Sequence, residues 1–345
     1  MAALEILLFA MGFTMAAAVV LSAVRTVAVP RGEQVLLSKA LFTTSRHVFR
    51  AMTRLARTPE SKEAFRARMA PMTMLLMPFV WALGVILGYS LMFWALGVRP
   101  YKDALVLSGS SFTTLGFRST TSFVEMLLAI SEALLGLGLV ALLISFMPSL
   151  YGAFSRREAL VSRLEVRAGH PPSPEEHILR AHRIGWLESL DTWAHWEQWF
   201  IEVEEAHTTY PALNFFRSPV PGRSWITSSA TVLDSASLMQ STVAVPNSAE
   251  ASLCIRAGYV ALRRIADYFE LDHPQDPGSG DAIAIKRSEF DGICDRLAAE
   301  GVPIVEDRDQ AWADFVGWRV NYDQALIAIC SMVEAPPGTW TTKTA

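Results

Sequence analysis

The sequence Arg99-Pro-Tyr-Lys-Asp-Ala-Leu-Val-Leu-Ser-Gly-Ser-Ser-Phe-Thr-Thr-Leu-Gly-Phe-Arg-Ser119 joins two long apolar runs of this chain. A loop that simply connected two membrane spans through water would be polar throughout, yet residues 104–117 carry no charge. The stretch begins like a helix, with Asp103 in its first turn near the positive end of the helix dipole. We therefore expect it to dip back into the membrane. Non-helical backbone at that depth is tolerated only where it is buried in protein or lines an aqueous path.

Three apolar segments account for the composition of the whole chain. Of its 345 residues, 51% are hydrophobic and 19% are charged, which is too apolar for an ordinary soluble protein. The excess lies in residues 4–24, 69–98 and 123–154, each longer than the roughly 20 residues that cross a bilayer. Glu5 stands where a signal peptide would have positive charge, which argues against cleavage. The sequence thus predicts an integral membrane protein with three transmembrane helices, and the lipid bilayer is its expected surroundings.

Charge predicts the orientation of these spans. Residues 1–154 contain thirteen Lys and Arg and seven Asp and Glu, a net charge of +6, whereas residues 155–345 carry −10. Ten of those thirteen basic residues lie in residues 25–68, which the positive-inside rule places in the cytoplasm. We expect a multi-pass protein of the plasma membrane with its N terminus outside and its tail cytoplasmic. Four arginines after the third span agree with this placement: Arg156, Arg157, Arg163 and Arg167.

The tail from residue 155 has helical patterns and no alternation of strands and helices, which predicts an all-α domain. Ser173 and Pro174 have the form of a helix start. We expect helices over residues 174–205, 224–242, 249–271, 287–301 and 307–334. Residues from Pro336 onward are expected to be disordered. The tail has no HExxH motif, no GxGxxG after a strand and no CxxC pair, so we expect no enzyme, no bound metal and no nucleotide-binding domain.

The segment between the second and third spans resembles part of a known protein family. The order span, short helix, Thr113-Thr-Leu-Gly-Phe117 and span resembles two-transmembrane potassium channels, whose filter is Thr-Val-Gly-Tyr-Gly. Leu127-Leu-Ala-Ile-Ser-Glu-Ala-Leu-Leu-Gly136 looks like the inner helix of bacterial channels. Most of the chain is covered, because three tail segments also resemble the helical domain of bacterial proteins grouped as a potassium channel family: Glu204-Glu-Ala-His-Thr-Thr-Tyr-Pro-Ala-Leu-Asn-Phe-Phe-Arg-Ser218, Ser224-Trp and Cys254-Ile-Arg-Ala-Gly-Tyr259.

The resemblance implies an all-α membrane protein with three transmembrane helices, one re-entrant pore loop and a helical cytoplasmic domain. Because each chain supplies one loop, it implies a homotetramer. The implied activity is passive cation conduction, with no cofactor, no nucleic acid, and an unidentified cytoplasmic ligand or protein as a further partner. The expected parts are an N-terminal transmembrane helix (1–28), a basic linker (29–68), a pore module (69–154) and the cytoplasmic domain (155–345). Within the linker, the spacing of apolar residues and Arg over 34–58 predicts a basic amphipathic helix on the inner membrane surface, with a plain solvated linker as the alternative.

The resemblance assigns the selectivity filter to five residues, whose carbonyl oxygens would replace the hydration shell of a cation. They are Thr113, Thr114, Leu115, Gly116 and Phe117. For the two threonines, the alternative is that they only cap the preceding helix.

The sequence departs from the channel pattern directly after this segment. Where the pattern has a second Gly and then usually Asp, this chain has Arg118 and Ser119. Gly is favoured there because the backbone adopts conformations that a Cβ resists, so we do not expect a full multi-site filter. Ser111-Phe-Thr-Thr-Leu-Gly-Phe117 also resembles the pore loops of Trk- and HKT-type transporters, which pass potassium, sodium or both. Potassium is the expected ion, with sodium as the alternative.

Charged residues around the loop are candidates for filter support or for the outer mouth: Arg118, Glu125 and Glu132. Four copies of Arg118 would repel cations if they pointed to the axis, so we expect the side chain to turn outward, toward Glu125 or Asp103. Glu132 lies well inside the third span, where an ionisable residue is costly. It is either functional or a carboxyl that hydrogen-bonds the pore helix.

Two glycines of the third span have two possible structural roles. Gly136 and Gly138 either let the inner helix bend during gating or permit close helix packing. A second function from another class also stays open. In it, the degenerate loop does not conduct, and the chain is a membrane-anchored sensor or scaffold.

Overall fold

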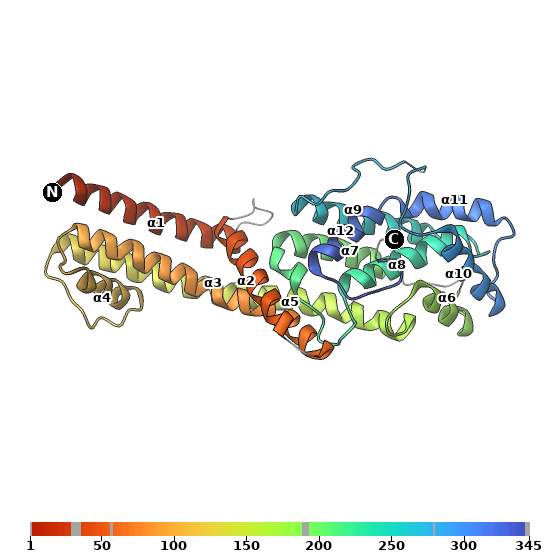
Figure 1. Cartoon of the computed structure of the whole chain (residues 1–345), viewed down its shortest axis with the longest axis horizontal. Helices are drawn as coiled ribbons and strands as arrows, with labels where there is room; N and C mark the ends of the chain where they lie inside the picture. Colours follow the sequence, from red (N-terminus) through yellow and green to blue (C-terminus); the bar gives the residue numbers. More distant parts are fainter. Residues whose placement is uncertain (1, 29–35, 56–57, 188–192, 279, 342–345) are drawn as a thin grey trace. The chain divides into compact units, whose positions relative to one another are not determined.

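The computed structural model describes residues 2–28, 36–55, 58–187, 193–278 and 280–341. This described part is all-α, as predicted, and contains no strand (Figure 1). An isolated antiparallel bridge between Val243 and Ile304 is the β-type pairing within it. The chain forms two compact units, Met1–Gly152 and Ala153–Ala345.

In the described residues, three helices are long and apolar enough to cross a membrane, over Ala3–Val27, Phe65–Ala95 and Phe123–Ala168. The first two lie in the first unit, and the third begins there and continues into the second. The predicted membrane protein with three candidate spans is therefore confirmed at that level. The helices of the first unit are α1 (Ala2–Ala28), α2 (Leu36–Leu55), α3 (Pro59–Ala95), α4 (Tyr101–Phe112) and the first part of α5 (Phe123–Ala168).

Helix α3, which contains the second candidate span, starts ten residues before the predicted apolar run of residues 69–98. A capping box explains this start: Ser61 donates its backbone N–H to Thr58 Oγ1 at 3.2 Å, and the Thr58 N–H bonds Ser61 Oγ at 3.3 Å. Pro59 stands at the first helical position, where its missing N–H is not needed. The amphipathic helix predicted within residues 29–68 is a helix over Leu36–Leu55. Residues 29–35 and 56–57 of that part lie outside the described residues.

Helices α1 and α3 pack closely against each other through glycine. A Cβ at Gly88 would lie 2.8 Å from the carbonyl oxygen of Gly12, and a Cβ at Gly12 would overlap the carbonyl oxygen of Gly88. Small residues at a helix crossing let two backbones approach, which supplies van der Waals contact where the hydrophobic effect cannot. A small buried cluster beside this crossing joins α1, α3 and α4 through Ala16, Val85, Tyr89, Met92, Phe93, Ala104 and Leu107.

The second unit begins with the end of α5 and continues with shorter helices. They are α6 (Pro174–Arg183), α7 (Trp193–Thr209), the 3₁₀ helix η1 (Pro211–Phe215), α8 (Trp225–Ser241), α9 (Ala249–Tyr268), α10 (Arg287–Ala299), α11 (Arg308–Arg319) and α12 (Asp323–Val333). Three of the five predicted tail helices are confirmed as α8, α9 and α10.

The other two predicted tail helices are wrong as single helices. The stretch 174–205 divides into α6 and α7, because Gly185 takes a left-handed φ of 71° and ends α6, with residues 188–192 outside the described residues. The stretch 307–334 divides into α11 and α12. The turn between them places Tyr322 so that its hydroxyl donates to Asp234 on α8 at 2.8 Å, a tertiary contact that no local pattern announces.

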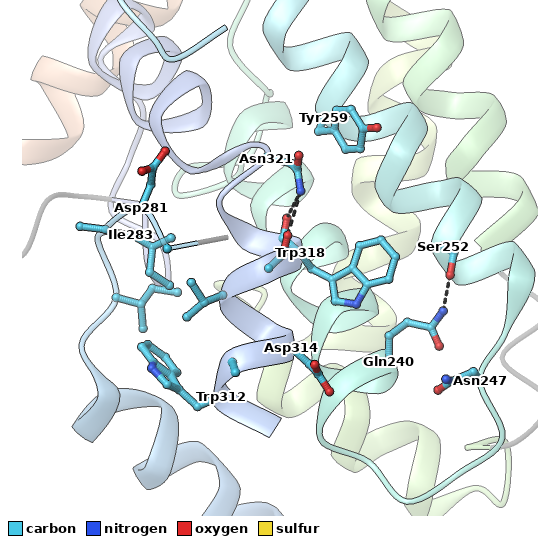
Figure 2. A pocket seen from close by; sticks show the side chains of 16 residues that line it. Gln240, Asn247, Ser252, Tyr259, Asp281, Ile283, Trp312, Asp314, Trp318 and Asn321 are labelled. Carbon is cyan, nitrogen blue, oxygen red and sulfur yellow. Dashed lines mark hydrogen bonds between the residues drawn. The ribbon is translucent and has the colours of Figure 1, made fainter. Parts of the chain in front are cut away.

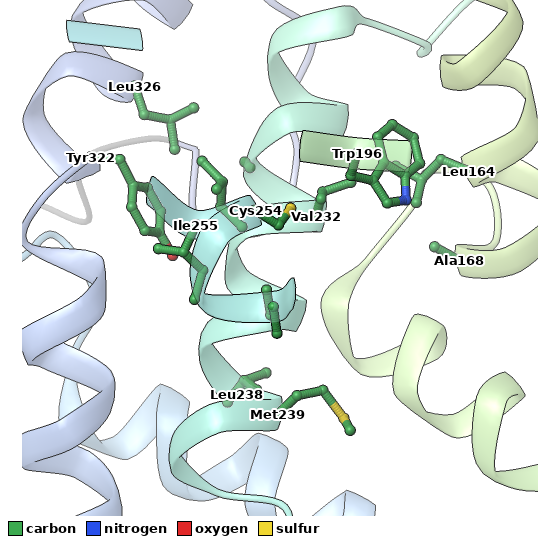
Figure 3. Packing of buried hydrophobic residues seen from close by; sticks show 14 of the residues in the cluster. Leu164, Ala168, Trp196, Val232, Leu238, Met239, Cys254, Ile255, Tyr322 and Leu326 are labelled. Carbon is green, nitrogen blue, oxygen red and sulfur yellow. The ribbon is translucent and has the colours of Figure 1, made fainter. Parts of the chain in front are cut away.

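Helix α8 is the centre of this unit. Figure 3 shows its Val232, Leu238 and Met239 among side chains from α9, α12, α7 and α5. Nearly every residue of α8 is buried although many are Ser or Thr. Most of their hydroxyls bond carbonyls one turn back, such as Ser235 Oγ to Thr231 O at 2.6 Å, which lets polar side chains enter the core. Ser228 Oγ is an exception, because it is buried without a hydrogen-bond partner in the described residues.

The end of the chain differs from the predicted disorder. Residues 336–341 pack onto α11: the Trp340 ring lies 5.6 Å from the Phe315 ring, and Arg319 donates to the Trp340 carbonyl at 2.7 Å. Thr341 is buried. Sequence composition could not indicate this because the contact depends on a distant arginine, and residues 342–345 lie outside the described residues.

Candidate functional site

Helix α4 packs against α3 through contacts at its N-terminal end and along one buried face. Its first residue, Tyr101, shares a 2.9 Å hydrogen bond between its hydroxyl and that of Ser90 on α3. Behind it, the guanidinium of Arg99 lies 4.6 Å from the centre of the Trp94 ring. Ala104 and Leu107 are buried on the same face. The position of α4 beside α3 therefore results from aromatic and polar contacts at one end and apolar packing along its length.

Ser110, which is fully buried, organises the loop that follows α4. Its carbonyl oxygen accepts the backbone N–H of Leu115 at 3.0 Å and that of Gly116 at 3.4 Å. Its hydroxyl oxygen accepts the N–H of Arg118 at 3.2 Å. One residue near the end of the helix thus binds three amides of the loop, and these amides point inward to the helix end.

The carbonyl oxygens of the loop show the opposite pattern. In the described residues, none of the five carbonyl oxygens from Thr113 to Phe117 accepts a hydrogen bond. All five residues are exposed in the single chain, with Leu115 at 70% and Phe117 at 67%. Amides that point inward and unpaired carbonyls are the polarity that a cation site made of backbone requires.

Two of these five residues have left-handed backbone. Gly116 has a φ of 69°, which glycine adopts freely, and Thr114 has a φ of 58°, which is uncommon for a residue with a branched Cβ. The Thr113 hydroxyl donates to Gly109 O at 2.6 Å, so this side chain caps α4, the alternative considered for it. A capping hydroxyl leaves the carbonyl of Thr113 available.

Arg118 turns back along α4 and forms an ion pair with Asp103, with 2.7 Å between Nη2 and Oδ2. Asp103 is one of the two carboxylates that the sequence offered for it. The other, Glu125, accepts a hydrogen bond from the Thr120 hydroxyl. Within the described loop, positive φ outside glycine occurs at Thr114 and not at Arg118. The backbone at position 118 therefore accommodates a side chain, contrary to the argument that this position needs glycine.

Glu132 is fully buried behind α4. Ser108 Oγ lies 2.5 Å from Glu132 Oε1 and 2.8 Å from the carbonyl oxygen of Ile86 on α3. The neighbouring Ser131 hydroxyl bonds the Tyr89 hydroxyl at 3.0 Å. Consecutive residues of α5 thus make polar contacts to α4 and α3.

The two glycines of α5 differ in their surroundings. A Cβ at Gly136 would overlap the carbonyl oxygen of Phe112 at the end of α4, whereas a Cβ at Gly138 would meet nothing within 4 Å. Close packing therefore explains Gly136 and gives no account of Gly138, which is exposed.

Sequence reasoning did not single out Ser108 or Ser110. Both lie on the buried face of α4. A serine in an uncharged helix is a weak signal, because its role depends on which carbonyl or carboxyl the fold places opposite its hydroxyl.

A second feature, an open cavity of about 1160 Å³, lies in the unit Ala153–Ala345 (Figure 2). Trp312 and Trp318 of α11 line it together with Tyr259 and Asp314. None of the described residues that line it is Lys or Arg, but two of its rings already have a guanidinium nearby: Arg263 lies 5.1 Å from the centre of the Tyr259 ring, and Arg287 lies 6.0 Å from the centre of the Trp312 ring. The sequence did not predict this cavity, since its walls come from four separate segments.

Comparisons with protein-family models, with curated proteins and with solved structures found no match to this chain. The family resemblance of the loop therefore stays a prediction. The geometry of the loop after α4 is the basis for assigning a function.

Proposed function

We propose that this chain is one subunit of a homotetrameric, potassium-channel-like cation channel that conducts passively. The observation that carries the proposal is the polarity of residues 113–117: the amides of residues 113–116 bind carbonyls of Ser110 and its neighbours at the end of α4, and all five carbonyl oxygens are unpaired within the described chain. This loop lies between two helices that are apolar enough to span a membrane. In such a position, free carbonyls are stable only in an aqueous path or against a cation.

Four copies complete the site. A single chain exposes residues 113–117, and lipid cannot hydrogen-bond the backbone there. A fourfold arrangement around this loop surrounds the ion with carbonyls from every subunit. The exposed side of α5, on which Gly138, Ser145 and Ser149 are exposed, would then face the inner cavity and the neighbouring subunits.

Potassium is the proposed ion, with sodium as the alternative. The alternative function, a non-conducting sensor or scaffold, was supported by the presence of Arg118 where the channel pattern has glycine. The ion pair of Arg118 with Asp103 now supports a filter in which four positive charges turn away from the axis. Only Gly116 is a glycine among the five filter residues, so fewer stacked sites are expected than in channels with the full motif, and we expect weaker exclusion of sodium.

Gating through the tail is part of the proposal. Helix α5 is continuous from Phe123 to Ala168 and so belongs to both units, with Pro148 inside it. A cytoplasmic domain attached to the inner helix in this way can transmit a ligand-dependent change to the pore. The expected orientation in the plasma membrane, with an outer N terminus, follows from the charge distribution.

The test is flux through purified protein in liposomes, combined with the reversal potential in potassium against sodium gradients and with the mass of the detergent-extracted oligomer. We expect a tetramer that passes potassium. A monodisperse monomer or dimer without flux would favour the sensor or scaffold instead.

A further inference from the structure

Ser108 has more acceptors around its hydroxyl than it has protons. A serine hydroxyl carries one proton, and Ser108 Oγ lies at hydrogen-bond distance from two oxygens, Ile86 O at 2.8 Å and Glu132 Oε1 at 2.5 Å. The Ile86 carbonyl can only accept. If Glu132 were a carboxylate, it could also only accept, and one of the two short oxygen–oxygen contacts would contain no proton.

The second oxygen of Glu132 gives independent evidence. The side chain has 0% exposure, and Oε2 has no hydrogen-bond partner among the described residues. A carboxylate in this position would spread a full charge over a buried oxygen without a donor. The free energy cost of burying a charged group without a hydrogen-bond donor or counter-ion is far larger than that of burying a neutral polar group.

A cation does not resolve the problem within this chain. The titratable side chain near Glu132 on α3 is Tyr89, whose hydroxyl bonds Ser131, and α4 presents Ser108. No Lys, Arg or His among the described residues pairs with Glu132. The missing proton must therefore come from the carboxyl itself.

We infer that Glu132 is a neutral carboxylic acid that donates its proton to Ser108, while Ser108 donates to the Ile86 carbonyl, and that this proton chain fastens α4 to α3 and α5. Glu132 is thus a positioning residue: it acts on the loop through α4 and does not touch the ion. Calling α4 a pore helix rests on the proposed function, but the protonation of Glu132 does not.

Infrared spectroscopy of the purified protein tests the protonation directly, without any need for conduction. The difference spectrum between wild type and Glu132→Gln should contain one protonated-carboxyl C=O band that the variant loses. Glu125→Gln is the matched control on the same helix, because Glu125 lies at the exposed start of α5 and accepts a bond from Thr120. If the Glu132→Gln difference shows the loss of a carboxylate band instead, the inference is overturned.

Two further variants separate a proton donor from a mere space filler. Gln can replace the acid as a donor to Ser108, so Glu132→Gln should keep the wild-type oligomer and its thermal stability, whereas Glu132→Leu, which fills similar space without a donor, should lose a large part of both. Ser108→Ala should shift the carboxyl band of Glu132, because it removes the acceptor. Equal behaviour of Glu132→Gln and Glu132→Leu, or an unshifted band in Ser108→Ala, would refute the proposed proton chain from Glu132 through Ser108. In liposomes, flux at least half of wild type in Glu132→Gln is expected; an absence of flux in wild type would contradict the proposed function and leave the infrared result valid.

Discussion

A Cβ atom at Gly136 would overlap the backbone carbonyl oxygen of Phe112, so α5 passes the end of α4 at a distance that only glycine allows. Phe112 is the last residue before the five exposed loop residues. The close approach therefore fixes the point from which the loop starts. It makes the packing of α5 a direct determinant of loop geometry.

Gly136→Ala should displace the end of α4. Overpacking of this kind costs about 1–3 kcal/mol, and we expect lower thermal stability together with at least tenfold lower flux. Gly138→Ala is the control for stability, because its Cβ meets nothing within 4 Å and alanine favours a helix over glycine. If both variants lose the same stability, the contact with Phe112 is not the reason.

Gly116→Val should abolish cation flux while a folded oligomer remains. Gly116 has a φ of 69°, and a Cβ added there would meet nothing within 4 Å, so the side chain strains the backbone and enters the proposed ion path without damaging the subunit core. Gly97→Val is the matched control, since Gly97 also has positive φ (107°) and open space but lies between α3 and α4. Undiminished flux in Gly116→Val would remove this residue from the filter.

Asp103→Asn should reduce cation flux more than Arg118→Gln does. The ion pair is partly exposed and contributes little to stability, on the order of 0.2–1 kcal/mol, but it keeps Arg118 turned along α4. Without Asp103, four guanidinium groups are free to face the mouth. We expect the double variant to recover the flux of Arg118→Gln, and the loss in Asp103→Asn to shrink at high ionic strength. Salt-independent loss would contradict an electrostatic cause.

Arg118→Gly addresses selectivity at the same position. Because the backbone of Arg118 already avoids positive φ, glycine should not add a carbonyl site, and the ratio of potassium to sodium permeability should stay near that of wild type. Reversal potentials measure this ratio. A clear sharpening of selectivity would mean that the side chain at position 118 limits the geometry of the proposed filter in the proposed tetramer.

Acid should destabilise the second unit through His177. Burial, and next the charge of Arg167, lower the pKa of His177 to about 4. Ser235 gives its proton to Thr231 O, so His177 Nδ1 must donate to Ser235 and Nε2, which has no partner in the described residues, stays unprotonated.

The direction of this pH dependence follows from the difference in His177 pKa between the folded and unfolded states. The folded pKa lies below the unfolded value near 6.5, so this contribution to stability is complete above pH 6.5 and is lost as the pH falls toward 4, by on the order of 3 kcal/mol. Denaturant unfolding followed by tryptophan fluorescence measures it. His177→Leu should reduce the dependence, while the buried His207, whose pKa burial also lowers, should retain part of it. Replacement of the exposed His195 by Leu should leave the dependence unchanged.

Arg319→Met should destabilise the second unit strongly. The fully buried guanidinium binds Asp234, donates to Asp323 at 2.9 Å and donates to the Trp340 carbonyl at 2.7 Å. Its removal leaves buried carboxylates unpaired, at a cost of about 3–5 kcal/mol. Arg296→Met is the control, because its ion pair with Glu175 is more than half exposed on the arginine side and is worth at most about 1 kcal/mol. Similar losses in both variants would contradict a buried network.

Much of the architecture was predictable from the chain alone. Length and apolarity determined three candidate spans, because crossing a bilayer requires a long uncharged helix whatever its neighbours are. Periodicity and turn residues determined the helical nature of the tail and the existence of α8, α9 and α10. The segment from Arg99 to Ser119 also indicated a helix followed by an irregular loop, since its caps and glycine act locally.

Tertiary structure alone decided the rest. The turn that divides 307–334 into α11 and α12 brings Tyr322 to Asp234, and residues 336–341 contact Arg319. Both contacts join residues that lie far apart in sequence. The same holds within the loop: Ser110 collects three amides, and Ser108 meets both Glu132 and Ile86, because helix packing places these oxygens together. Local propensity determines which segments are helical, but hydrogen-bond partners between helices are set by three-dimensional proximity, which a single sequence does not encode in any local pattern.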